Sequence, residues 1–521
     1  MQTKEMSPFG SSIVDLVKHL KAKNISAESI IEAVYARIER YNKSLNVFLS
    51  LLPKDFAISR ARKIDKKLAN GENVGNLAGI PISIKDNICI SDSDLRNSCG
   101  SKILKDFKSP YNATVVEKLL SEDAIIIGTT NMDEFAMGSS TENSSFGATL
   151  NPWNKDFVPG GSSGGAAVSV VSGMSLIALG SDTGGSVRQP ASMCGVTGFK
   201  PTYGTVSRYG LVAYGSSLDQ IGVFGQRASD CEYVFDVING YDLKEATSAN
   251  INFIETPVVE NLNGLNFCIP DEYIDSESID PEVVSSVNEF ADFLSEHGAL
   301  VERQSFDFLK YVIPTYYLIA FAEASSNLGR FDGVRYGIRN RDHSSVKSLY
   351  ESTRKMGFGE EVKRRIMLGT FVLSSGYYEQ YYGKALKVRS SMEINVSRIF
   401  KKYDFILGPV SPFTAFKIGE KTESPLSMYL ADIYSVLANL TRTPAISIPG
   451  RISKNGLPIG IQIMGRRFED NRLLSTASVI QSMTDYHLKR PFWKKFTFYP
   501  IIFPTFEVIL IEEIIIYEIK L

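Results

Sequence analysis

Hydrophobic residues recur at helical spacing near the start of the chain. Ile13, Leu16 and Leu20 lie three to four residues apart, so they would share one face of a helix, and Ser26 is a suitable N-cap for a second helix. We therefore predict that the segment from about residue 10 to residue 70 is helical and packs on the rest of the protein.

A different period follows between residues 77 and 90. Ile80, Ile82 and Ile84 alternate with other residues, which is the spacing of a β-strand with one apolar face. The opposite face of this strand would carry the polar side chain of Lys85. The pattern thus predicts a strand that presents a lysine from an otherwise apolar setting.

Strand-like and helical stretches then alternate along the chain. A helical pattern over residues 112–120 precedes a short apolar strand at 124–128, which suggests a βαβ unit with helices on both faces of a sheet. Residues from about 280 to 400 are mostly helical and charged, whereas 407–418 and 445–464 again resemble strands. We predict an α/β fold.

The composition is that of an ordinary globular protein, and together with the chain length it favours a single domain. Hydrophobic residues make up 44% of the 521 positions, and large α/β enzymes often run to this length as one unit. We predict a single domain over residues 1–490. Residues 491–521 are crowded with Phe, Tyr and Ile, and we interpret them as an atypical C-terminal extension to which we assign no function.

Charge and cysteine usage restrict the partners and the compartment. The 56 Lys and Arg residues face 58 Asp and Glu residues, so there is no basic excess of the kind that RNA-binding proteins carry. Any RNA contact should therefore lie mainly on another subunit. The five cysteines form no Cys-x-x-Cys pair, and there is no signal-like start or run of about 18 apolar residues. We expect a cytoplasmic protein that does not contact a membrane.

Two glycine-rich stretches carry the candidate chemistry. Gly160–Gly165 and Gly180–Ser186 both place serines beside paired glycines. Neither stretch has the Gly-Lys-Ser/Thr ending of a phosphate-binding loop or the spacing of a dinucleotide fingerprint. Serines in such turns are suited to nucleophilic catalysis, since neighbouring backbone N–H groups can then point at a developing oxyanion.

A nucleophilic serine also needs a base. The four histidines are His19, His297, His343 and His487, and none lies among these serines, although a distant one could fold into the site. Lys85 is the other candidate, but its ordinary pKa of ~10.4 must be lowered by burial or by nearby positive charge. Taken alone, the residues favour a simple pairing of Lys85 with Asp86 or another carboxylate.

The motifs resemble those of the amidase signature family. The stretch Pro159–Thr202, which includes Asp182–Pro190, is similar to the signature of that family, and Gly79–Asn87 is similar to its lysine strand. The resemblance extends over about residues 10–490. It implies the amidase signature fold, in which a large mixed β-sheet is covered by helices on both faces.

The resemblance also implies a catalytic triad without histidine. Carried over by position, Ser186 is the nucleophile, Ser162 is a bridging serine that follows a cis peptide bond, and Lys85 is the base. The backbone N–H groups that the resemblance assigns to the oxyanion hole are those of Thr183, Gly184, Gly185 and Ser186. By default we interpret Ser163 and Ser181 as structural.

Within the family, the chain looks most like the glutamine-hydrolysing subunits of amidotransferases that act on glutamyl-tRNA(Gln). The stretches that carry this likeness are Thr130–Ser140, Gly204–Leu211, Arg364–Thr370 and Met428–Asp432. The likeness implies that Tyr316, Arg365 and Asp432 hold glutamine, because an amino acid needs one cation and one anion at fixed places. Two alternatives stay open: Arg365 could belong to a solvated charged face, and Tyr317 could replace Tyr316.

The same likeness implies a division of labour between subunits. Two companions are expected, a larger B subunit that activates glutamyl-tRNA(Gln) with ATP and Mg²⁺ and a small C subunit, with most tRNA contacts on the partner. This chain would carry no cofactor and no metal. The alternatives are a free-standing amidase for small or lipid amides, a non-catalytic binding or scaffold subunit and, in third place, a phosphate-binding protein. One departure from the family pattern is Thr441-Arg442-Thr443, which stands where a small apolar stretch is more typical.

Overall fold

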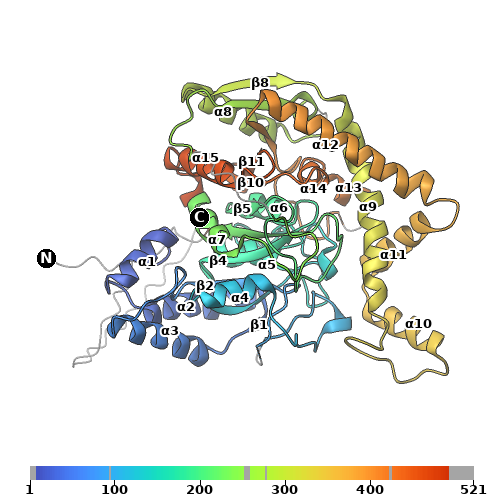
Figure 1. Cartoon of the computed structure of the whole chain (residues 1–521), viewed down its shortest axis with the longest axis horizontal. Helices are drawn as coiled ribbons and strands as arrows, with labels where there is room; N and C mark the ends of the chain where they lie inside the picture. The colour runs from blue at the N-terminus through green and yellow to red at the C-terminus, as the bar shows by residue number, and fades with distance from the viewer. Residues whose placement is uncertain (1–6, 93–94, 251–257, 276–277, 422–424, 492–521) are drawn as a thin grey trace, which may run out of the picture.

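The fold is built on one mixed sheet of eleven strands (Figure 1). The computed structural model describes residues 7–92, 95–250, 258–275, 278–421 and 425–491. The strand order is β1-β3-β2-β4-β6-β5-β10-β11-β9-β7-β8. The strands are β1 Phe48–Leu51, β2 Pro81–Lys85, β3 Ile125–Thr130, β4 Ile177–Asp182, β5 Thr197–Lys200, β6 Gln220–Gly225, β7 Asn266–Pro270, β8 Leu300–Gln304, β9 Phe405–Pro409, β10 Ala445–Ile452 and β11 Pro458–Met464.

Helices cover both faces of this sheet, as the amidase signature fold implies. They are α1 Ile13–Lys21, α2 Ala27–Leu45, α3 Lys54–Ala69, α4 Thr114–Ser121, α5 Gly164–Val171, α6 Arg188–Cys194, α7 Ala228–Ile238, α8 Pro281–Glu296, α9 Val312–Asn327, α10 Val346–Gly357, α11 Glu360–Leu373, α12 Lys384–Lys402, α13 Pro425–Leu430, α14 Val436–Leu440 and α15 Asp470–Ser482. The helices α5 and α6 pack together, as do α7 and α15. All residues of α5 and α6 are buried, so the glycine-rich block is part of the core.

The central strands bring the lysine motif and the second serine motif to one edge of the sheet. β2 runs parallel to both β3 and β4, with Ile84 opposite Leu179. The carboxyl ends of parallel strands meet at the same edge, so Lys85 at the end of β2 comes beside Ser181 near the end of β4. The two long sequence motifs therefore meet through strand pairing.

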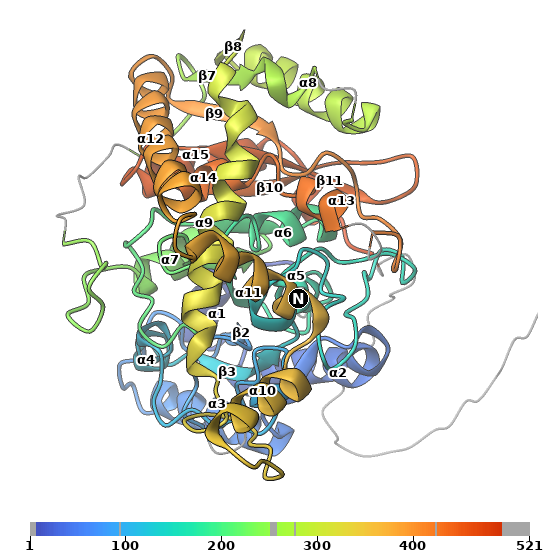
Figure 2. The same ribbon diagram turned by 90° about the vertical axis from the view of Figure 1, so that its right-hand side faces the viewer.

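One long helix lies along the side of the molecule next to this edge. Figure 2 shows α9 running across the side that faces the viewer, with α11 packed beside it. The buried residues of α9 include Tyr316, Tyr317 and Ala320, so this face of the helix points into the protein. The candidate substrate residues on α9 and α11 thus come from neighbouring helices.

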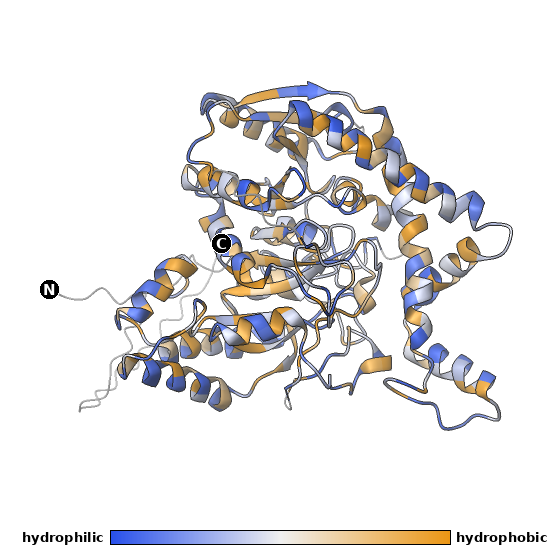
Figure 3. Ribbon diagram, in the orientation of Figure 1, coloured by the Kyte–Doolittle hydropathy of each residue, from blue (hydrophilic) through white to orange (hydrophobic). Residues whose placement is uncertain are grey.

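The structure differs from the sequence prediction at several elements. The first 70 residues contain the strand β1 beside their helices, and the strand predicted over 77–90 is only Pro81–Lys85. The mostly helical region 280–400 contains β8, whose residues are largely exposed and polar, because it is an edge strand (Figure 3). An edge strand has little of the apolar alternation that reveals a strand in sequence. Residues 492–521, nearly all of the proposed extension, lie outside the described residues.

Figure 3 shows how the apolar residues are distributed over the helices and strands. Orange, apolar positions concentrate on the central strands and on the inward faces of the N-terminal helices, where Leu16, Leu20 and Ile30 are completely buried. Among the described residues, every helix is too short or too polar to cross a bilayer.

Candidate active site

Lys85 lies fully buried among hydroxyl and carbonyl oxygens. Its Nζ is 2.7 Å from the Oγ of Ser162, 3.0 Å from the Oγ of Ser181 and 3.3 Å from the Ser181 carbonyl oxygen. Burial lowers the pKa of this amine to about 7, against the opposing charges of Asp133, Asp182 and Asp219. A neutral amine has two N–H donors and one lone pair, so it can donate to Ser181 and accept the Ser162 proton.

The simple pairing of Lys85 with Asp86 is wrong. The Asp86 carboxylate accepts the N–H of Ser98 at 2.9 Å and that of Gly100 at 3.3 Å, and it also accepts the Ser98 hydroxyl. Successive residues of a strand point to opposite faces, which separates the amine from this carboxylate. Among the described residues, no carboxylate forms an ion pair with Lys85.

Ser162 follows a cis peptide bond at a position where the chain is tightly enclosed. The Gly161–Ser162 bond is cis, as the family resemblance implies. A Cβ atom at Gly161 would lie 2.2 Å from the Asp133 carboxylate and 2.7 Å from the Ser140 nitrogen, so only glycine fits. The Gly161 N–H donates to the Gln189 side chain at 2.8 Å. The turn is thereby fixed to the helix that follows the second serine motif.

Ser186 is the least buried residue of its motif. It is half-buried, whereas its neighbours in the motif are buried, and its hydroxyl makes no hydrogen bond to any described residue, Ser162 included. The hydroxyl is therefore free to take up the role of a nucleophile. Ser163, whose Oγ donates to the Ser181 carbonyl at 3.2 Å, helps to hold the two serine motifs against each other.

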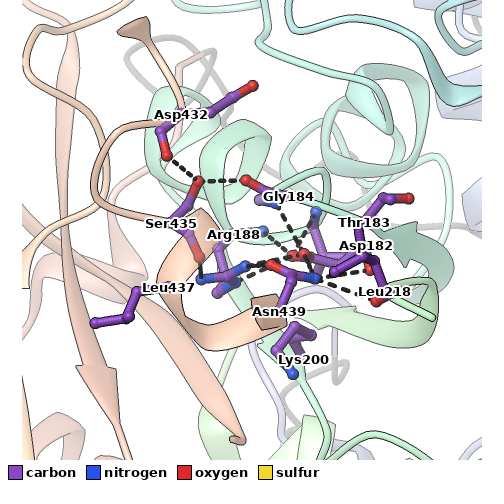
Figure 4. A network of polar contacts seen from close by, with 12 residues as sticks. Asp182, Thr183, Gly184, Arg188, Lys200, Leu218, Asp432, Ser435, Leu437 and Asn439 are labelled. Carbon is purple, nitrogen blue, oxygen red and sulfur yellow. Dashed lines mark hydrogen bonds and ion pairs between the residues drawn. The ribbon is translucent and has the colours of Figure 1, made fainter. Parts of the chain in front are cut away.

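A buried ion pair supports the loop that carries Ser186. The Arg188 guanidinium lies 2.9 Å from the Asp182 carboxylate, and both side chains are completely buried (Figure 4). Arg188 also donates to the side chains of Asn439 and Gln462, at 2.7 and 2.6 Å. Burial alone would raise the pKa of Asp182, but the charge and hydrogen bonds of Arg188 hold it well below its usual range. Arg188 is thus part of the scaffold that supports the loop of Ser186.

The structure corrects the predicted oxyanion hole at Gly185. Its N–H donates to the Asp182 carboxylate at 2.8 Å, so it is already engaged. The N–H groups of Thr183, Gly184 and Ser186 donate to no described residue. Sequence reasoning could not separate these four groups, because which N–H turns toward Asp182 depends on the local backbone. Three donors therefore remain for an oxyanion.

The structure also separates the two adjacent tyrosines of α9. The Tyr316 hydroxyl lies against Gly184, since a Cβ added there would be 2.3 Å from it, and it has no hydrogen-bond partner among the described residues. The Tyr317 hydroxyl instead donates to Asp432 at 3.1 Å. Tyr316 is therefore the tyrosine that faces the nucleophile loop, and Tyr317 orients the carboxylate.

Asp432 is a buried carboxylate with few donors. It is 7% exposed and accepts the Ser139 hydroxyl at 2.9 and 3.0 Å, besides Tyr317. Burial raises its pKa to about 7, although these hydrogen bonds act in the opposite direction. A buried carboxylate without a cation is costly, so a positively charged ligand group would stabilise it.

Arg365 is buried, unlike its charged neighbours on α11. It is 2% exposed, which rules out the solvated-face interpretation. Its guanidinium donates to Glu361 at 2.7 Å, to the Tyr214 hydroxyl at 2.9 Å and to the Gly138 carbonyl at 2.7 Å. These bonds use three of the five N–H groups of an arginine, which leaves two for a ligand carboxylate. Since Gly138 precedes Ser139, the contacts of Arg365 and Asp432 lie on adjacent residues.

Sequence reasoning missed two residues that hold the site together. Ser181 contacts the Lys85 amine through two of its oxygens, although the sequence suggested no more than a structural role for it. Gln189 bridges the Gly161 N–H and, at 3.0 Å, the carbonyl oxygen of Ser139. The only sequence signal for both was their position inside the long motifs, because polar side chains that bond to backbone have no characteristic spacing.

Comparison with known proteins places this geometry among amidases. The sequence model of the Amidase family matches residues 29–474. The chain is 50% identical over 488 residues to the A subunit of glutamyl-tRNA(Gln) amidotransferase from Desulforamulus reducens, covering 93% of this chain and 100% of that protein. It is 48% identical to the corresponding protein of Halalkalibacterium halodurans, which carries the same name, again covering 93% and 100%.

Solved structures agree with the sequence comparison. The crystal structure of the A subunit of glutamyl-tRNA(Gln) amidotransferase from Thermotoga maritima is 41% identical, with a TM-score of 0.75, over 92% of this chain and 95% of that one. A bacterial aryl acylamidase of the amidase signature family shares the fold, with a TM-score of 0.81 at 22% identity over 94% of this chain and 100% of that one.

Proposed function

The chain belongs to the amidase family, and from this premise we propose that it hydrolyses the side-chain amide of glutamine as the A subunit of a glutamyl-tRNA(Gln) amidotransferase. The observation that carries the proposal is the contact of 2.7 Å between the buried Lys85 amine and the Ser162 hydroxyl, in a setting that lowers the amine pKa to about 7. Relatives named for that subunit match nearly the full length of the described chain.

The first half of the reaction forms an acyl-enzyme at Ser186. The neutral amine of Lys85 takes the Ser162 proton while the Ser162 oxygen takes the proton of Ser186. The Ser186 oxygen then bonds to the side-chain amide carbon, and the N–H groups of Thr183 and Gly184, with that of Ser186, hold the oxyanion. The relay returns a proton to the leaving nitrogen, the carbon–nitrogen bond breaks, and ammonia departs.

The second half releases glutamate. A water molecule takes the place of ammonia, and the same relay removes its proton as its oxygen bonds to the acyl carbon. The bond to Ser186 breaks, the serine regains its proton, and the neutral amine of Lys85 is restored. Each group returns to its starting protonation state, so no cofactor is consumed in this chain.

Glutamine is the substrate that best suits the charged groups beside Ser186. The two remaining N–H groups of Arg365 can bind an α-carboxylate, and Asp432 can accept from an α-ammonium. The Tyr316 hydroxyl can supply a further hydrogen bond. An amidase for aryl or aliphatic amides gains nothing from a buried cation and anion, whose desolvation is costly.

The outer face of α11 supports an association with companion subunits. Met367 is 70% exposed and Phe371 is 49% exposed, and Tyr377 and Tyr381 stack beside Phe371. Exposed apolar patches of this kind mark protein interfaces. We propose that the B and C subunits associate with this chain, and that ATP, Mg²⁺ and most tRNA contacts belong to B.

The proposal is tested by glutamate release from glutamine in the complex purified with its companion subunits and supplied with tRNA. Ser186→Ala should abolish release, whereas Ser172→Ala, a matched change at a buried serine outside the site, should leave it intact. Retained release in Ser186→Ala would refute the assignment. A preference of the unmodified enzyme for aryl or aliphatic amides over glutamine would refute the substrate.

A further inference from the structure

Three arginines surround a cavity that the proposed glutamine site does not use. The cavity has a volume of about 630 Å³ and is lined by Arg208, Arg442 and Arg467, together with Tyr203 and Phe468. The three arginines are far apart in the sequence, so the sequence shows no basic stripe.

The cavity is distinct from the active site but lies near it. Its wall includes Glu323, which follows Tyr316 by seven residues on α9. Seven residues make about two helical turns, so Glu323 lies ~10 Å along α9 from Tyr316. Ser217, another wall residue, donates its N–H to Glu323 at 2.8 Å.

Aromatic rings hold the three guanidinium groups in place. The Cζ atoms of Arg208 and Arg442 lie 5.0 and 5.7 Å from the centre of the Tyr203 ring, and that of Arg467 lies 4.9 Å from the centre of Phe468. Such stacking orients the planar guanidinium. Arg208 already donates to the Ser216 carbonyl, to Thr247 at 2.8 Å and to Glu245 at 3.2 Å, whereas the N–H groups of Arg467 donate to no described residue. The arginines are therefore partly ordered before any ligand binds.

The positive charges around the cavity are unevenly paired. Arg208 pairs with Glu245 at 3.2 Å, and Arg442 approaches Glu393 at 3.5 Å, which Arg389 also approaches at 3.7 Å. The guanidinium of Arg467 forms neither an ion pair nor a hydrogen bond with any described residue.

The four arginines Arg208, Arg389, Arg442 and Arg467 are matched in number by Glu245, Glu323, Glu393 and the buried Asp219, which interacts with Arg208. Among the described residues, the guanidinium without a close carboxylate is that of Arg467, away from Glu245. An anion that binds there gains hydrogen bonds that the protein does not supply.

The backbone of Arg442 adds an independent sign of a special role. Its φ is +61°, a left-handed conformation that residues other than glycine rarely adopt. The same residue stands in the segment that departs from the family pattern. An arginine kept at a strained position beside this cavity supports a binding function.

Basic side chains continue beyond this cavity. Arg467 also lines a neighbouring cavity of about 460 Å³ with Arg466 and Lys401, and Lys401 lines a third, of about 420 Å³, with Arg398. The first and second cavities share Arg467, and the second and third share Glu393, Ser397 and Lys401, so the three cavities adjoin; we call them together the arginine groove.

We propose that the arginine groove binds phosphate groups, with Arg442 and Arg467 as the primary site. A guanidinium fork matches two phosphate oxygens, and the further basic residues Lys401 and Arg398 suit consecutive phosphodiesters of an RNA strand better than a free nucleotide. The proposal does not depend on the glutaminase function, because none of these residues takes part in the amide chemistry.

The test measures binding of three probes to the full-length chain. The probes are a transfer RNA transcript, ATP and a polyglutamate peptide, each over a range of salt concentrations. Arg442→Gly, which relieves the left-handed strain, and Arg467→Gln should each weaken RNA binding about ten-fold and lower the salt slope by about one. The matched control Arg96→Gln, which removes a surface arginine paired with Asp106, should change neither.

The outcomes separate the sources of phosphate. RNA binding that weakens in both groove variants supports the proposal with a phosphodiester ligand, and ATP binding that weakens in both supports it with a nucleotide. The proposal would be overturned if polyglutamate bound as tightly as RNA. It would also be overturned if Arg442→Gly, Arg467→Gln and Arg96→Gln all bound RNA equally tightly. Glutamine hydrolysis should be unchanged in all three variants, so a failure here is distinguishable from a failure of the glutaminase proposal.

Discussion

Replacing Asp432 with asparagine should remove recognition of the substrate ammonium while leaving the site intact. Asparagine has the same shape and can still accept from Ser139, which lies 2.9 and 3.0 Å from the two carboxylate oxygens. A hydrogen bond to a charged group contributes ~1.5–3 kcal/mol. At ~1.4 kcal/mol for each factor of ten, Asp432→Asn should lower kcat/KM for glutamine about 10- to 150-fold.

The assay compares glutamine with glutaramate, which is glutamine without its amino group. The unmodified enzyme should prefer glutamine by about the same 10- to 150-fold, and Asp432→Asn should lose that preference because its kcat/KM for glutaramate hardly changes. Ser139→Ala is the matched control, since it removes a neighbour of the carboxylate but keeps the charge. An equal fall for both substrates in Asp432→Asn would refute the ammonium contact and assign Asp432 a structural role.

Two further predictions concern the loop that carries the nucleophile. Gly184→Ala should lower kcat at least about 100-fold, because the new Cβ would lie 2.3 Å from the Tyr316 hydroxyl at the oxyanion hole, and steady-state kinetics that stay unchanged would contradict the placement of Tyr316. Arg188→Met should lower the free energy of unfolding by ~3–5 kcal/mol, because it leaves Asp182 buried without its partner, and urea denaturation at neutral pH measures this change. A loss below about 1 kcal/mol would contradict it.

Elements with a periodic hydrophobic pattern could be predicted from the sequence. Elements that depend on a single contact could not. Alternating isoleucines located β2 and the lysine at its end. The exposed edge strand β8 has no such alternation, and β1 is only four residues long between two helices. Pattern reasoning therefore found the centre of the sheet more readily than its borders.

The site shows the same division. The resemblance to the amidase signature family pointed to Lys85, Ser162 and Ser186, whereas the residues alone favoured an ion pair between Lys85 and Asp86 or another carboxylate. Only the strand geometry turns the amine toward Ser181 and away from that carboxylate. In the same way, burial distinguishes Arg365 from its charged neighbours on α11, and burial is a property of helix packing.

The central claim is that an uncharged Lys85 amine withdraws the Ser186 proton through Ser162. The most direct measurement is the rate at which a fluorophosphonate probe labels Ser186 from about pH 5 to about pH 10, because this probe needs the nucleophile but no ammonium site. The base works only when unprotonated, so the rate should rise about ten-fold per pH unit below the lysine pKa, which burial lowers to about 7, and level off above it.

The pH-dependent rise should disappear in Lys85→Ala and persist in Asp432→Asn, which removes a carboxyl group whose pKa also lies at about 7. A rate that still climbs about ten-fold per pH unit up to about pH 10, as the ordinary lysine pKa of ~10.4 would give, or a Lys85→Ala protein labelled as fast as the unmodified one, would contradict the account.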